Sequence, residues 1–502
     1  MFKIELVYID SLVRNSLKTC RTAGFCSCAF LPLSLRWMNA LDSAYWCTKL
    51  ADSEPCRFLT QYVLPNIFCC RMPFATSSSL AAFVGQDITV KGWLYNKRSS
   101  GPIAFLEVRD GYGWRSIVAA KESLSPDVWA EVEKVTQESS VTLTGTVTKH
   151  PKREGIFEIQ LKDFKVLQLA IDYPIAKKEH GPDFLLENRH LWLRSKRQWA
   201  ILRLRDRIMM AMEEYLHHQA FIRLDSPVFT PNACEGTTTL FPVPYFDEGT
   251  AYLSQSGQLY IEAGIGAVGR CYDFGPVFRA EKSKTKRHLT EFWMMDAEAA
   301  FVEFEENTMI QEGLARYVVR ACLEKCQEEL AILERDIEKL RKVDAPFVHL
   351  SYDEAIKQLH TLGSDIKYGE DLGNDDEGLL TKESAVPIFI ERWPKDIKSF
   401  YMKRDPNNPN LALGSDLIAT EGAGEIAGGS QREESLEILL DRIRHENLPE
   451  ADYQWYLDTR RYGSVPHSGF GFGLERLVRW ISGTEHIREC IPFPRTIGRL
   501  RP

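Results

Sequence analysis

The segment of residues 269–298, GRCYDFGPVFRAEKSKTKRHLTEFWMMDAE, constrains the fold more than any other part of this chain. Residues 270–278 and 291–298 have the composition of β-strands, and the loop between them is too basic to be buried. Two such arms around a polar connection predict an antiparallel hairpin. Any fold for the chain must therefore hold this hairpin and leave its loop in contact with solvent.

Four residues of this hairpin have the chemistry that an ATP site needs. Arg279 and Glu281 follow the first arm, His288 lies in the loop, and Phe292 opens the second arm. A guanidinium can bind phosphate or carboxylate, a cationic loop can neutralise pyrophosphate, and an aromatic face can stack on adenine. A solvated hairpin with a surface salt bridge is the commoner outcome for such residues, so the hairpin alone leaves both interpretations open.

Length and charge narrow the class of protein. A chain of 502 residues with 44% hydrophobic content can bury substantial cores, and its length predicts two to four domains. The net charge of -8 argues against a generally polycationic nucleic-acid binder, although it is compatible with a local RNA-binding face. We find no run of 18 or more apolar residues and predict no transmembrane helix.

The cysteines and the N-terminal segment give information on where in the cell the protein works. No cysteine pair has the CxxC spacing of a zinc site, and the body of the chain has few thiols, which is typical of a reduced, cytoplasmic protein. Residues 1–78 are apolar and rich in Cys and Ser, without a sustained period. We expect a disordered or non-native extension, with Met72 as an alternative start. Scattered arginines leave organellar targeting open.

Residues 79–170 have the pattern of a small barrel. QDITVKGWLY, VTLTGTVTK and FEIQLKDF alternate between apolar and polar residues and are separated by turns, which predicts an OB-fold. In the strand IAFLEVRD, Phe105 shares a face with Arg109, and Arg98 lies on the preceding loop. An exposed aromatic beside cations suits single-stranded RNA. A half-buried edge-strand phenylalanine is the alternative, because twelve basic and eleven acidic residues between 80 and 170 nearly cancel.

The remaining chain mixes helices and strands. A helix is expected after the N-cap Ser195, and the strand FIRLDSPVF contains Pro227, which predicts an edge or an interface. One long helix is expected over residues 306–342. Further expectations are an acidic loop at GEDLGNDDEG, strands at VPIFI, FYM and LALGSDLIA, and glycine-interrupted backbone before a helix in HSGFGFGLERLVRWISG.

Three of these segments, in order, resemble the signature motifs of class II aminoacyl-tRNA synthetases: the Pro227 strand, the FRAE hairpin and GFGFGLER. With a barrel upstream, the arrangement resembles the aspartyl, asparaginyl and lysyl subgroup. The resemblance covers about residue 85 to the C-terminus. It implies an α+β protein with an N-terminal OB-fold β-barrel and a catalytic domain built on an antiparallel sheet flanked by helices. We accordingly expect an extension at 1–78, an anticodon-binding domain at 79–170, a linker at 171–188 and the catalytic domain at 189–502.

The resemblance implies roles for the residues of an ATP site. Arg279 corresponds to the arginine that binds the α-phosphate and the amino-acid carboxylate, and Glu281 lies near the adenine amino group. His288 takes the position that contacts the γ-phosphate. Phe292 and Arg476 correspond to the pair that encloses adenine between a ring and a guanidinium.

Other matching residues imply magnesium and amino-acid binding. Asp416 and Glu425 resemble the acids that hold Mg²⁺ at the triphosphate, and Asp416 is the weaker match because the spacing before Glu425 varies. Glu235, Ser256 and Gln258 match positions that bind the substrate α-amino group.

The side-chain pocket distinguishes the members of the subgroup. Aspartyl enzymes have a lysine where this chain has Ile261, and burying a carboxylate without that partner would cost several kcal/mol. Glu262 could accept a hydrogen bond from an amide, and Arg432 resembles the arginine that binds the side-chain carbonyl. SQSGQLYIEA and GEIAGGSQREE thus resemble the asparaginyl enzymes.

The barrel matches the family at two positions and departs from it at one. Arg98 and Phe105 match an arginine and an aromatic that bind the anticodon, whereas Ser116 stands where related enzymes often have a glutamine. The expected ligands are ATP, Mg²⁺, L-asparagine and tRNA(Asn), and a homodimer is implied by the family. Three alternatives stay open: an aspartyl or dual-specificity enzyme, a catalytically idle RNA-binding paralogue, and a relative of asparagine synthetase, which would lack the barrel.

Overall fold

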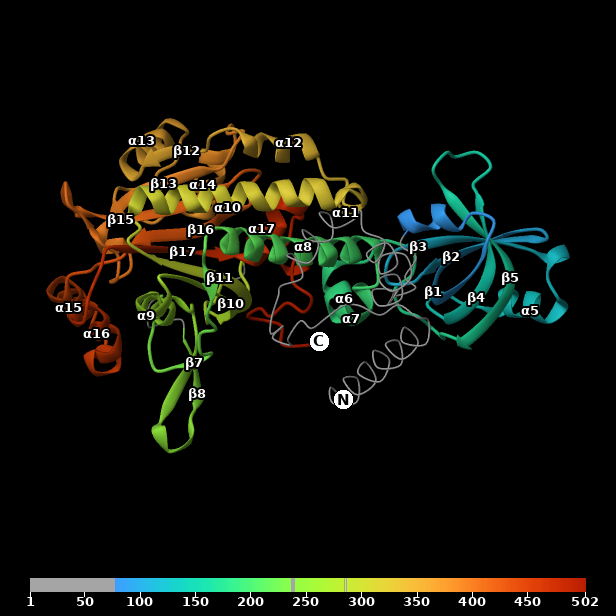
Figure 1. Cartoon of the computed structure of the whole chain (residues 1–502), viewed down its shortest axis with the longest axis horizontal. Coiled ribbons are helices and arrows are strands. Elements are labelled where there is room, and N and C mark those ends of the chain that lie inside the picture. The colour runs from blue at the N-terminus through green and yellow to red at the C-terminus, as the bar shows by residue number, and fades with distance from the viewer. Residues whose placement is uncertain (1–76, 236–239, 284, 286) are drawn as a thin grey trace, which may run out of the picture. The chain divides into compact units, whose positions relative to one another are not determined.

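The computed structural model describes residues 77–235, 240–283, 285 and 287–502 (Figure 1). Nearly all of the expected extension at 1–78 lies outside the described residues. The chain divides into two compact units, Met1–Pro174 and Ile175–Pro502. Within the described residues, no helix is both long and apolar enough to cross a membrane.

The described part of the first unit is a closed barrel with strand order β1-β2-β3-β5-β4, which confirms the predicted OB-fold. Its core contains Leu94, Val108, Val141 and Ile159, each at most 1% exposed. The elements are η2 (Ser77–Phe83), β1 (Asp87–Ser100), β2 (Ile103–Arg109), β3 (Trp114–Ala120), η3 (Lys121–Ser123), α5 (Pro126–Lys134), β4 (Ser140–Lys149) and β5 (Phe157–Gln168).

One feature of the barrel differs from the sequence prediction. Phe105 is 47% exposed, as expected, but Arg109 is only 8% exposed. Arg109 donates to Glu138 at 2.8 Å, and its guanidinium lies 4.7 Å from the centroid of the Trp93 ring. Alternation along one strand could not reveal these two partners, which come from other parts of the barrel. Arg109 is therefore not available beside Phe105 as an exposed cation.

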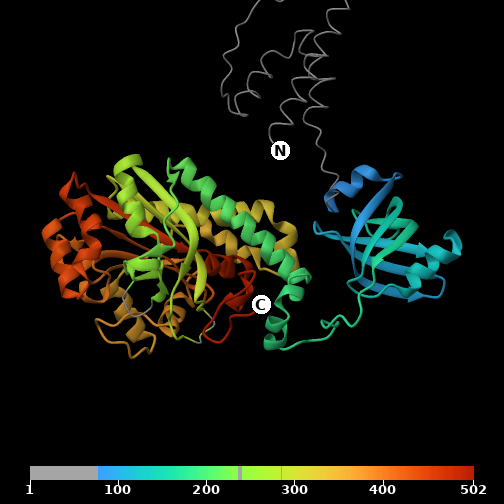
Figure 2. The ribbon, with the colours of Figure 1, turned by 90° about the horizontal axis from the view of Figure 1, so that it is seen from below.

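The second unit is built on a long sheet with the order β12-β13-β15-β16-β17-β11-β10-β6. Most neighbours are antiparallel, and the β12–β13 and β10–β6 pairs at its two edges are parallel. α8 and α10 lie side by side, and α10 also contacts β15, β16 and β17 (Figures 1 and 2). The sheet strands are β6 (Ile222–Arg223), β10 (Arg270–Phe278), β11 (Glu291–Ala300), β12 (Val348–Ser351), β13 (Ile388–Pro394), β15 (Asn408–Ala419), β16 (Gly424–Gln431) and β17 (His467–Gly473).

Smaller elements surround this sheet. β14 (Arg404–Asp405) pairs with β15, while β7 (Phe229–Thr230), β8 (Phe241–Pro244) and β9 (Thr250–Leu253) form a separate sheet. The helices are α6 (Pro182–Glu187), α7 (Arg189–Trp192), α8 (Lys196–His218), α9 (Gln258–Val268), α10 (Phe304–Lys325), α11 (Gln327–Ile332), α12 (Ile337–Arg341), α13 (Tyr352–Thr361), α14 (Asn374–Thr381), α15 (Leu436–His445), α16 (Gln454–Arg461) and α17 (Leu474–Ser482). Short 3₁₀ turns are η5 (Phe246–Glu248), η6 (Lys342–Asp344), η7 (Lys395–Ile397), η8 (Glu450–Tyr453) and η9 (Ile487–Glu489).

The hairpin prediction is confirmed. β10 and β11 pair in antiparallel register from Arg270 opposite Ala299 to Phe278 opposite Glu291. The backbone N–H of Gln198 donates to the Ser195 hydroxyl, so the predicted N-cap of α8 is also confirmed. The segment around Pro227 contains only the short strands β6 and β7, and β6 lies at an edge of the main sheet.

Three local predictions are wrong. The helix expected over 306–342 is three helices, α10 to α12, interrupted at Cys326 and at Glu334, whose φ is 55°. The second half of the acidic run expected as a loop forms the start of α14 (Asn374–Thr381), because acids in the first turn complement the positive end of the helix dipole. FYM forms no strand, and only Met402 makes an isolated bridge, to Arg432. Residues 171–188, whose assignment as a linker stays a prediction, include the short helix α6.

Candidate active site

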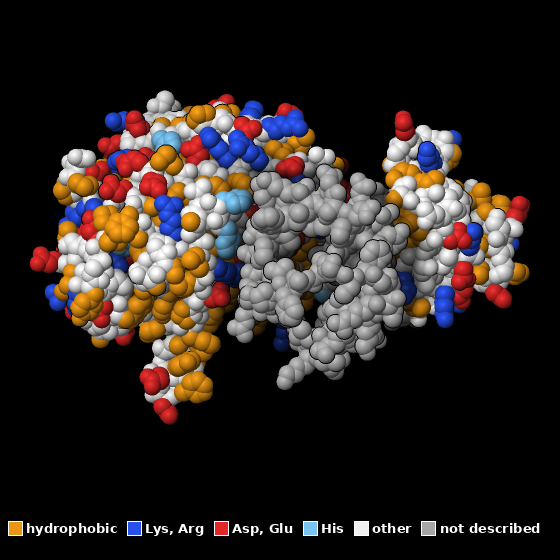
Figure 3. All heavy atoms as spheres, viewed as in Figure 1, with side chains coloured by type: hydrophobic (Ala, Val, Ile, Leu, Met, Phe, Trp, Pro, Cys, Tyr) orange, Lys and Arg blue, Asp and Glu red, His pale blue; other side chains and the backbone are white. Residues whose placement is uncertain are grey.

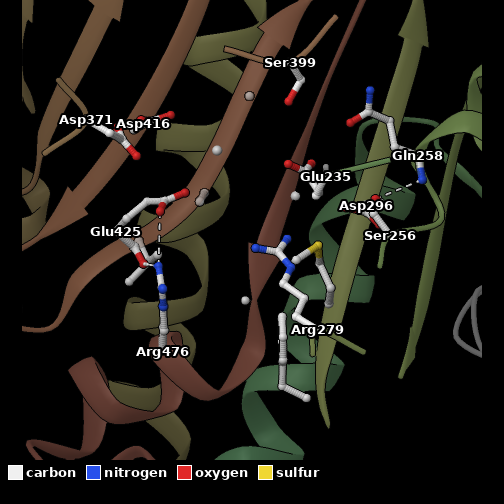
Figure 4. A pocket seen from close by; sticks show the side chains of 18 of the residues that line it. Glu235, Ser256, Gln258, Arg279, Asp296, Asp371, Ser399, Asp416, Glu425 and Arg476 are labelled. Carbon is white, nitrogen blue, oxygen red and sulfur yellow. Dashed lines mark hydrogen bonds and ion pairs between the residues drawn. The ribbon is translucent and has the colours of Figure 1, made fainter. Parts of the chain in front are cut away.

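A cavity of about 350 Å³ lies in the second unit, lined by residues of the main sheet and adjoining loops. β11 contributes Phe292, Met294 and Asp296, and Arg279 comes directly after β10. β15, β16 and β17 contribute from the centre of the sheet. In Figure 4, Ser256, Gln258 and Asp296 lie on one side of Arg279, and Asp416 and Glu425 lie on the other. We call the first side the amino-acid end and the second the triphosphate end.

The cavity brings together residues that are far apart in the sequence. Eleven of the predicted site residues line it: Glu235, Ser256, Gln258, Arg279, Glu281, His288, Phe292, Asp416, Glu425, Arg432 and Arg476. Glu262 is not among the lining residues.

Arg279 stands between the two ends. Its guanidinium carbon lies 5.5 Å from the centroid of the Phe292 ring, and its buried Nε has no hydrogen-bond partner among the described residues. Burial disfavours the charged guanidinium, but nearby acids, led by Glu235 and Glu281, more than offset this and raise the pKa of Arg279. The cavity thus contains a permanent cation whose donors are not all used within the protein.

At the triphosphate end, Arg476 and Glu425 are paired but accessible. The Nη1 of Arg476 donates to the backbone carbonyl of Glu425 at 2.7 Å and to its carboxylate at 3.2 Å. The two side chains are 29% and 37% exposed. Both groups can therefore contact a ligand without leaving a buried charge unpaired.

The basic hairpin loop is tied to α14. Arg287 donates to Glu377 at 2.5 Å, to Asn374 at 2.8 Å and to the carbonyl of Gly422 at 2.8 Å. His288 follows, and its Nε2 lies 3.6 Å from Glu281. Burial and the nearby Arg476 lower the pKa of His288, so it is neutral at pH 7 and can donate to or accept from a phosphate.

Asp416 is paired with a residue that the sequence did not single out. Lys398 Nζ lies 2.7 Å from the Asp416 carboxylate. Burial raises the pKa of Asp416 to about 7, Lys398 opposes this rise, and Glu425 adds to it. Burial alone would lower the pKa of Lys398, but Asp416 and Asp371 outweigh it and raise that pKa.

The amino-acid end is a chain of hydrogen bonds. The Ser256 hydroxyl donates to Asp296 at 2.8 Å, and the backbone N–H of Gln258 donates to Ser256 at 3.1 Å. The Gln258 side-chain amide donates to Glu262 at 2.9 Å. Glu235 accepts a hydrogen bond from the Tyr401 hydroxyl at 2.9 Å. The polar side chains here are held in place before any ligand binds.

Glu262 was expected to contact the substrate, and the structure does not support a direct contact. Its side chain is fully buried behind Gln258. Tyr456 and Arg460 each donate to it at 2.6 Å, and His467 lies 3.3 Å away. Burial would raise the pKa of Glu262, but these partners, led by Arg460, hold it well below its ordinary value. The sequence could not show that the Glu262 carboxylate already accepts hydrogen bonds from other side chains of the protein.

Arg432 lines the cavity and has its own buried acid. Its Nε donates to Glu298 at 3.0 Å, and its Nη1 donates to Ser430 at 2.5 Å. Burial raises the pKa of Glu298 to about 8, although Arg432 opposes the shift. Glu262 also lies 4.0 Å from Arg432, so two acids surround this guanidinium.

Several further residues of the cavity region are functional candidates that the sequence motifs do not include. Asp296 and Glu298 are two positions apart on β11, and this spacing puts both side chains on the same face as each other, a signal that could have been used. Lys398, Arg287 and Tyr401 gave no such signal, because their partners lie elsewhere in the chain.

The predicted anticodon residues lie on the barrel. Arg98 and Phe105 are opposite each other in the β1–β2 register, and both are exposed. Ser116 lies on β3 opposite Glu107 and is also exposed. An exposed guanidinium and an exposed ring on adjacent strands can bind a phosphate and stack on a base.

Comparisons with known proteins agree with this geometry. Residues 181–497 match the family of tRNA synthetases class II (D, K and N), and residues 88–167 match the OB-fold nucleic acid binding domain. The chain is 52% identical to an asparagine–tRNA ligase of Pelotomaculum thermopropionicum over 423 residues, which cover 84% of this chain and 98% of that protein.

Solved structures are similar as well. Asparaginyl-tRNA synthetase from Pyrococcus horikoshii, complexed with asparaginyl-adenylate, has a TM-score of 0.82 and 40% identity, covering 85% of this chain and 99% of that one. The Entamoeba histolytica asparaginyl-tRNA synthetase in complex with asparaginyl-adenylate has a TM-score of 0.75 and 31% identity, covering 83% of this chain and 97% of that one.

Proposed function

The chain belongs to the asparaginyl-tRNA synthetases, within the class II tRNA synthetases of the D, K and N group, and we propose that the cavity described above is where it activates asparagine. In the first step, the carboxylate of L-asparagine attacks the α-phosphate of ATP, giving asparaginyl-adenylate and pyrophosphate. In the second, a terminal ribose hydroxyl of tRNA(Asn) attacks the acyl carbon and AMP leaves.

The observation that carries this proposal is the position of Arg279. It is a buried permanent cation between the amino-acid and triphosphate ends, with an unused donor. Such a group can bind the α-phosphate and the attacking carboxylate together and stabilise the charge that builds up between them. Phosphoryl chemistry of this kind needs positioning and charge more than a protein nucleophile.

Adenine and the terminal phosphates are assigned to the hairpin and to β17–α17. Phe292 stacks on adenine with Arg476 on its other side, and Glu281 accepts from the adenine amino group. His288 contacts the γ-phosphate. The tie between Arg287 and α14 supports these roles because it limits how far the loop can move.

The amino-acid end binds asparagine through residues of fixed orientation. The side-chain NH₂ of Gln258 donates to Glu262, which leaves the Gln258 side-chain carbonyl oxygen to accept from the substrate ammonium. Glu235 and Ser256 line the same part of the cavity. Arg432 donates to the side-chain carbonyl. An aspartate carboxylate would lie near the buried Glu262, whose low pKa keeps it ionised, which supports preference for the neutral amide. Glu262 is thus a positioning residue.

Glu425 fits the requirements of a magnesium ligand. Magnesium is commonly held by one or two carboxylates together with substrate phosphates, and the Glu425 carboxylate lines the cavity and is partly exposed. Bound there, Mg²⁺ would neutralise charge on the triphosphate. No group of three or more His, Cys, Asp or Glu that could hold a metal occurs among the described residues, so the ligand phosphates must supply further oxygens.

We further propose a domain assignment and partners beyond the cavity. Residues 79–170 bind the anticodon through Arg98 and Phe105, and residues 189–502 form the catalytic domain. A homodimer is supported by exposed apolar side chains of the β7–β9 sheet and its η5 turn, where Phe229 is 49% and Phe246 is 91% exposed. Figure 3 shows hydrophobic side chains along this projecting part, with acidic side chains at its end. The five cysteines of the described residues are free and buried, which supports a cytoplasmic location.

The test is ATP–pyrophosphate exchange measured with asparagine and with aspartate, followed by charging of tRNA(Asn). We expect exchange with asparagine and little with aspartate. Preference for aspartate would overturn the assignment of the pocket, and no exchange with any amino acid would favour a catalytically idle paralogue.

A further inference from the structure

A buried lysine occupies the acidic side of the triphosphate end. Lys398 follows η7, and its Nζ lies 2.7 Å from Asp416 and 3.9 Å from Asp371. It also lies 3.7 Å from the centroid of the Trp393 ring. The side chains of Lys398 and Asp416 are each only 13% exposed. The ammonium is thus held by two carboxylates and one aromatic face, within the lining of the cavity.

This arrangement bears on the acid expected to share in magnesium binding. Asp416 and Asp371 lie together in Figure 4, with Glu425 below them. A divalent cation on Asp416 would stand close to the Lys398 ammonium and be repelled by it. Lys398 also acts on Glu425, but no ion pair joins the two among the described residues. The Glu425 carboxylate lies 3.2 Å from Arg476, and its side chain is 37% exposed, against 13% for Asp416. The two acids therefore differ in their ability to accept a metal.

We infer that the Lys398 ammonium takes the place of a divalent cation at Asp416, so that Glu425, and not Asp416, binds Mg²⁺ at the triphosphate. The inference rests on the proposed function of the cavity and refines it. The Lys398 ammonium supplies a positive charge 2.7 Å from Asp416, so no metal needs to be recruited there. The triphosphate then meets one fewer unpaired carboxylate.

The same geometry predicts what happens when the ammonium is removed. In a Lys398→Met variant, Asp416 and Asp371 would lose the ammonium that lies against both of them. Two carboxylates beside a bound triphosphate can hold a divalent ion. The variant should gain a cation site, and the gain should require Asp416.

Binding of Mn²⁺ can be followed by electron paramagnetic resonance of the free ion, in the presence of α,β-methylene-ATP so that no chemistry occurs. We expect Asp416→Asn to keep wild-type cation affinity within about two-fold, and Glu425→Gln to weaken it at least ~10-fold. Lys398→Met should bind one more Mn²⁺ per chain. The double variant Lys398→Met, Asp416→Asn should return to the wild-type number.

The outcomes separate this inference from the function on which it rests. Loss of affinity in Asp416→Asn comparable to that in Glu425→Gln, or no added site in a folded Lys398→Met, would overturn the role of Lys398. Unchanged affinity in Glu425→Gln would instead count against the proposed magnesium site. Thermal unfolding checks each variant, and if Lys398→Met does not fold, Asp416→Asn alone still decides the question.

Discussion

At the amino-acid end of the cavity, Glu262 and Arg460 have side chains no more than 1% exposed and are joined at 2.6 Å, whereas at the triphosphate end Glu425 and Arg476 are about a third exposed. The first pair belongs to a network that also includes Tyr456 and His467. The second pair has few partners, and both of its members line the cavity. One end has its charges satisfied by the protein, and the other keeps charges for a ligand.

This difference matches what each end must bind. A buried network of charges is costly to assemble and contributes little to stability, but it can fix the orientation of neighbouring groups. Here it fixes the amide of Gln258, which faces a small substrate. The triphosphate carries several negative charges, so the triphosphate end needs accessible cations to bind it and a loop that leaves room for it. Four substitutions test the contrast.

Removing Arg279 should give the largest effect, because both ends depend on it. We expect Arg279→Ala to lower asparagine-dependent pyrophosphate exchange by about 10²–10³-fold or more, as loss of a charged donor at a developing anion does. Arg270→Ala is a matched control: this arginine begins β10, the strand that Arg279 directly follows, but it pairs with Glu306 and is not among the cavity-lining residues. Retained exchange in Arg279→Ala would refute its assigned role.

Breaking the network at the amino-acid end should act on one substrate only. Glu262→Gln removes the charge that pairs with Arg460 and disturbs the orientation of Gln258. The KM for asparagine should therefore rise by about 10–100-fold, which corresponds to roughly 1.4–2.8 kcal/mol. The KM for ATP should change little. Stability should fall by about 3–5 kcal/mol. Glu338→Gln removes an exposed ion pair with Arg341 and should change neither. Equal effects on both KM values would show that the two ends are not separate.

A substitution in the barrel should leave the amino-acid and triphosphate ends of the cavity unaffected. Phe105→Ala removes an exposed ring and should raise the KM for tRNA by about ten-fold, because stacking on one base contributes roughly 1–3 kcal/mol. Pyrophosphate exchange, which needs no tRNA, should stay at the wild-type rate. A variant with reduced exchange and normal tRNA affinity would contradict the assignment of Phe105.

The smallest effect concerns an acid behind the amino-acid end. Asp273 lies opposite Asp296 in the β10–β11 register, and burial together with repulsion from Asp296 raises the pKa of Asp273 to about 8. Because the unfolded chain loses this proton near its ordinary pKa of 3.8, the native state loses stability as pH rises from about 4 to about 8. Asp273→Asn should therefore raise Tm by a few degrees at pH 8.5 and by less at pH 5.

Asp458→Asn is the control for this prediction, because Asp458 is 47% exposed and paired with Arg461. The difference in Tm between this variant and the wild type should be the same at pH 5 and pH 8.5. If Asp273→Asn gains more stability at pH 5 than at pH 8.5, Asp273 is ionised and stabilising in the native protein.

The hairpin and the barrel could be predicted from sequence because each depends on local alternation and turns. β10 and β11 have the predicted pairing, and Arg279, His288 and Phe292 all line the cavity. The break in the helix after Lys325 could not be predicted, since the apolar period continues beyond it. Glu262 shows a further limit of prediction from sequence. A glutamate can accept a hydrogen bond from a substrate amide, but only the tertiary structure shows that Arg460 and Tyr456 already donate to this carboxylate. Lys398 was missed for the same reason.

The most direct test of the central claim is calorimetric titration with two non-hydrolysable adenylate analogues, the asparaginyl and the aspartyl sulfamoyl-adenosines. They share every group that the triphosphate end and Arg279 would contact, so any difference arises at the amino-acid end. Because the acidic analogue would place a second negative charge near the ionised Glu262, we predict that the asparaginyl analogue binds at least ~100-fold more tightly. Equal affinities, or tighter binding of the aspartyl analogue, would contradict the account.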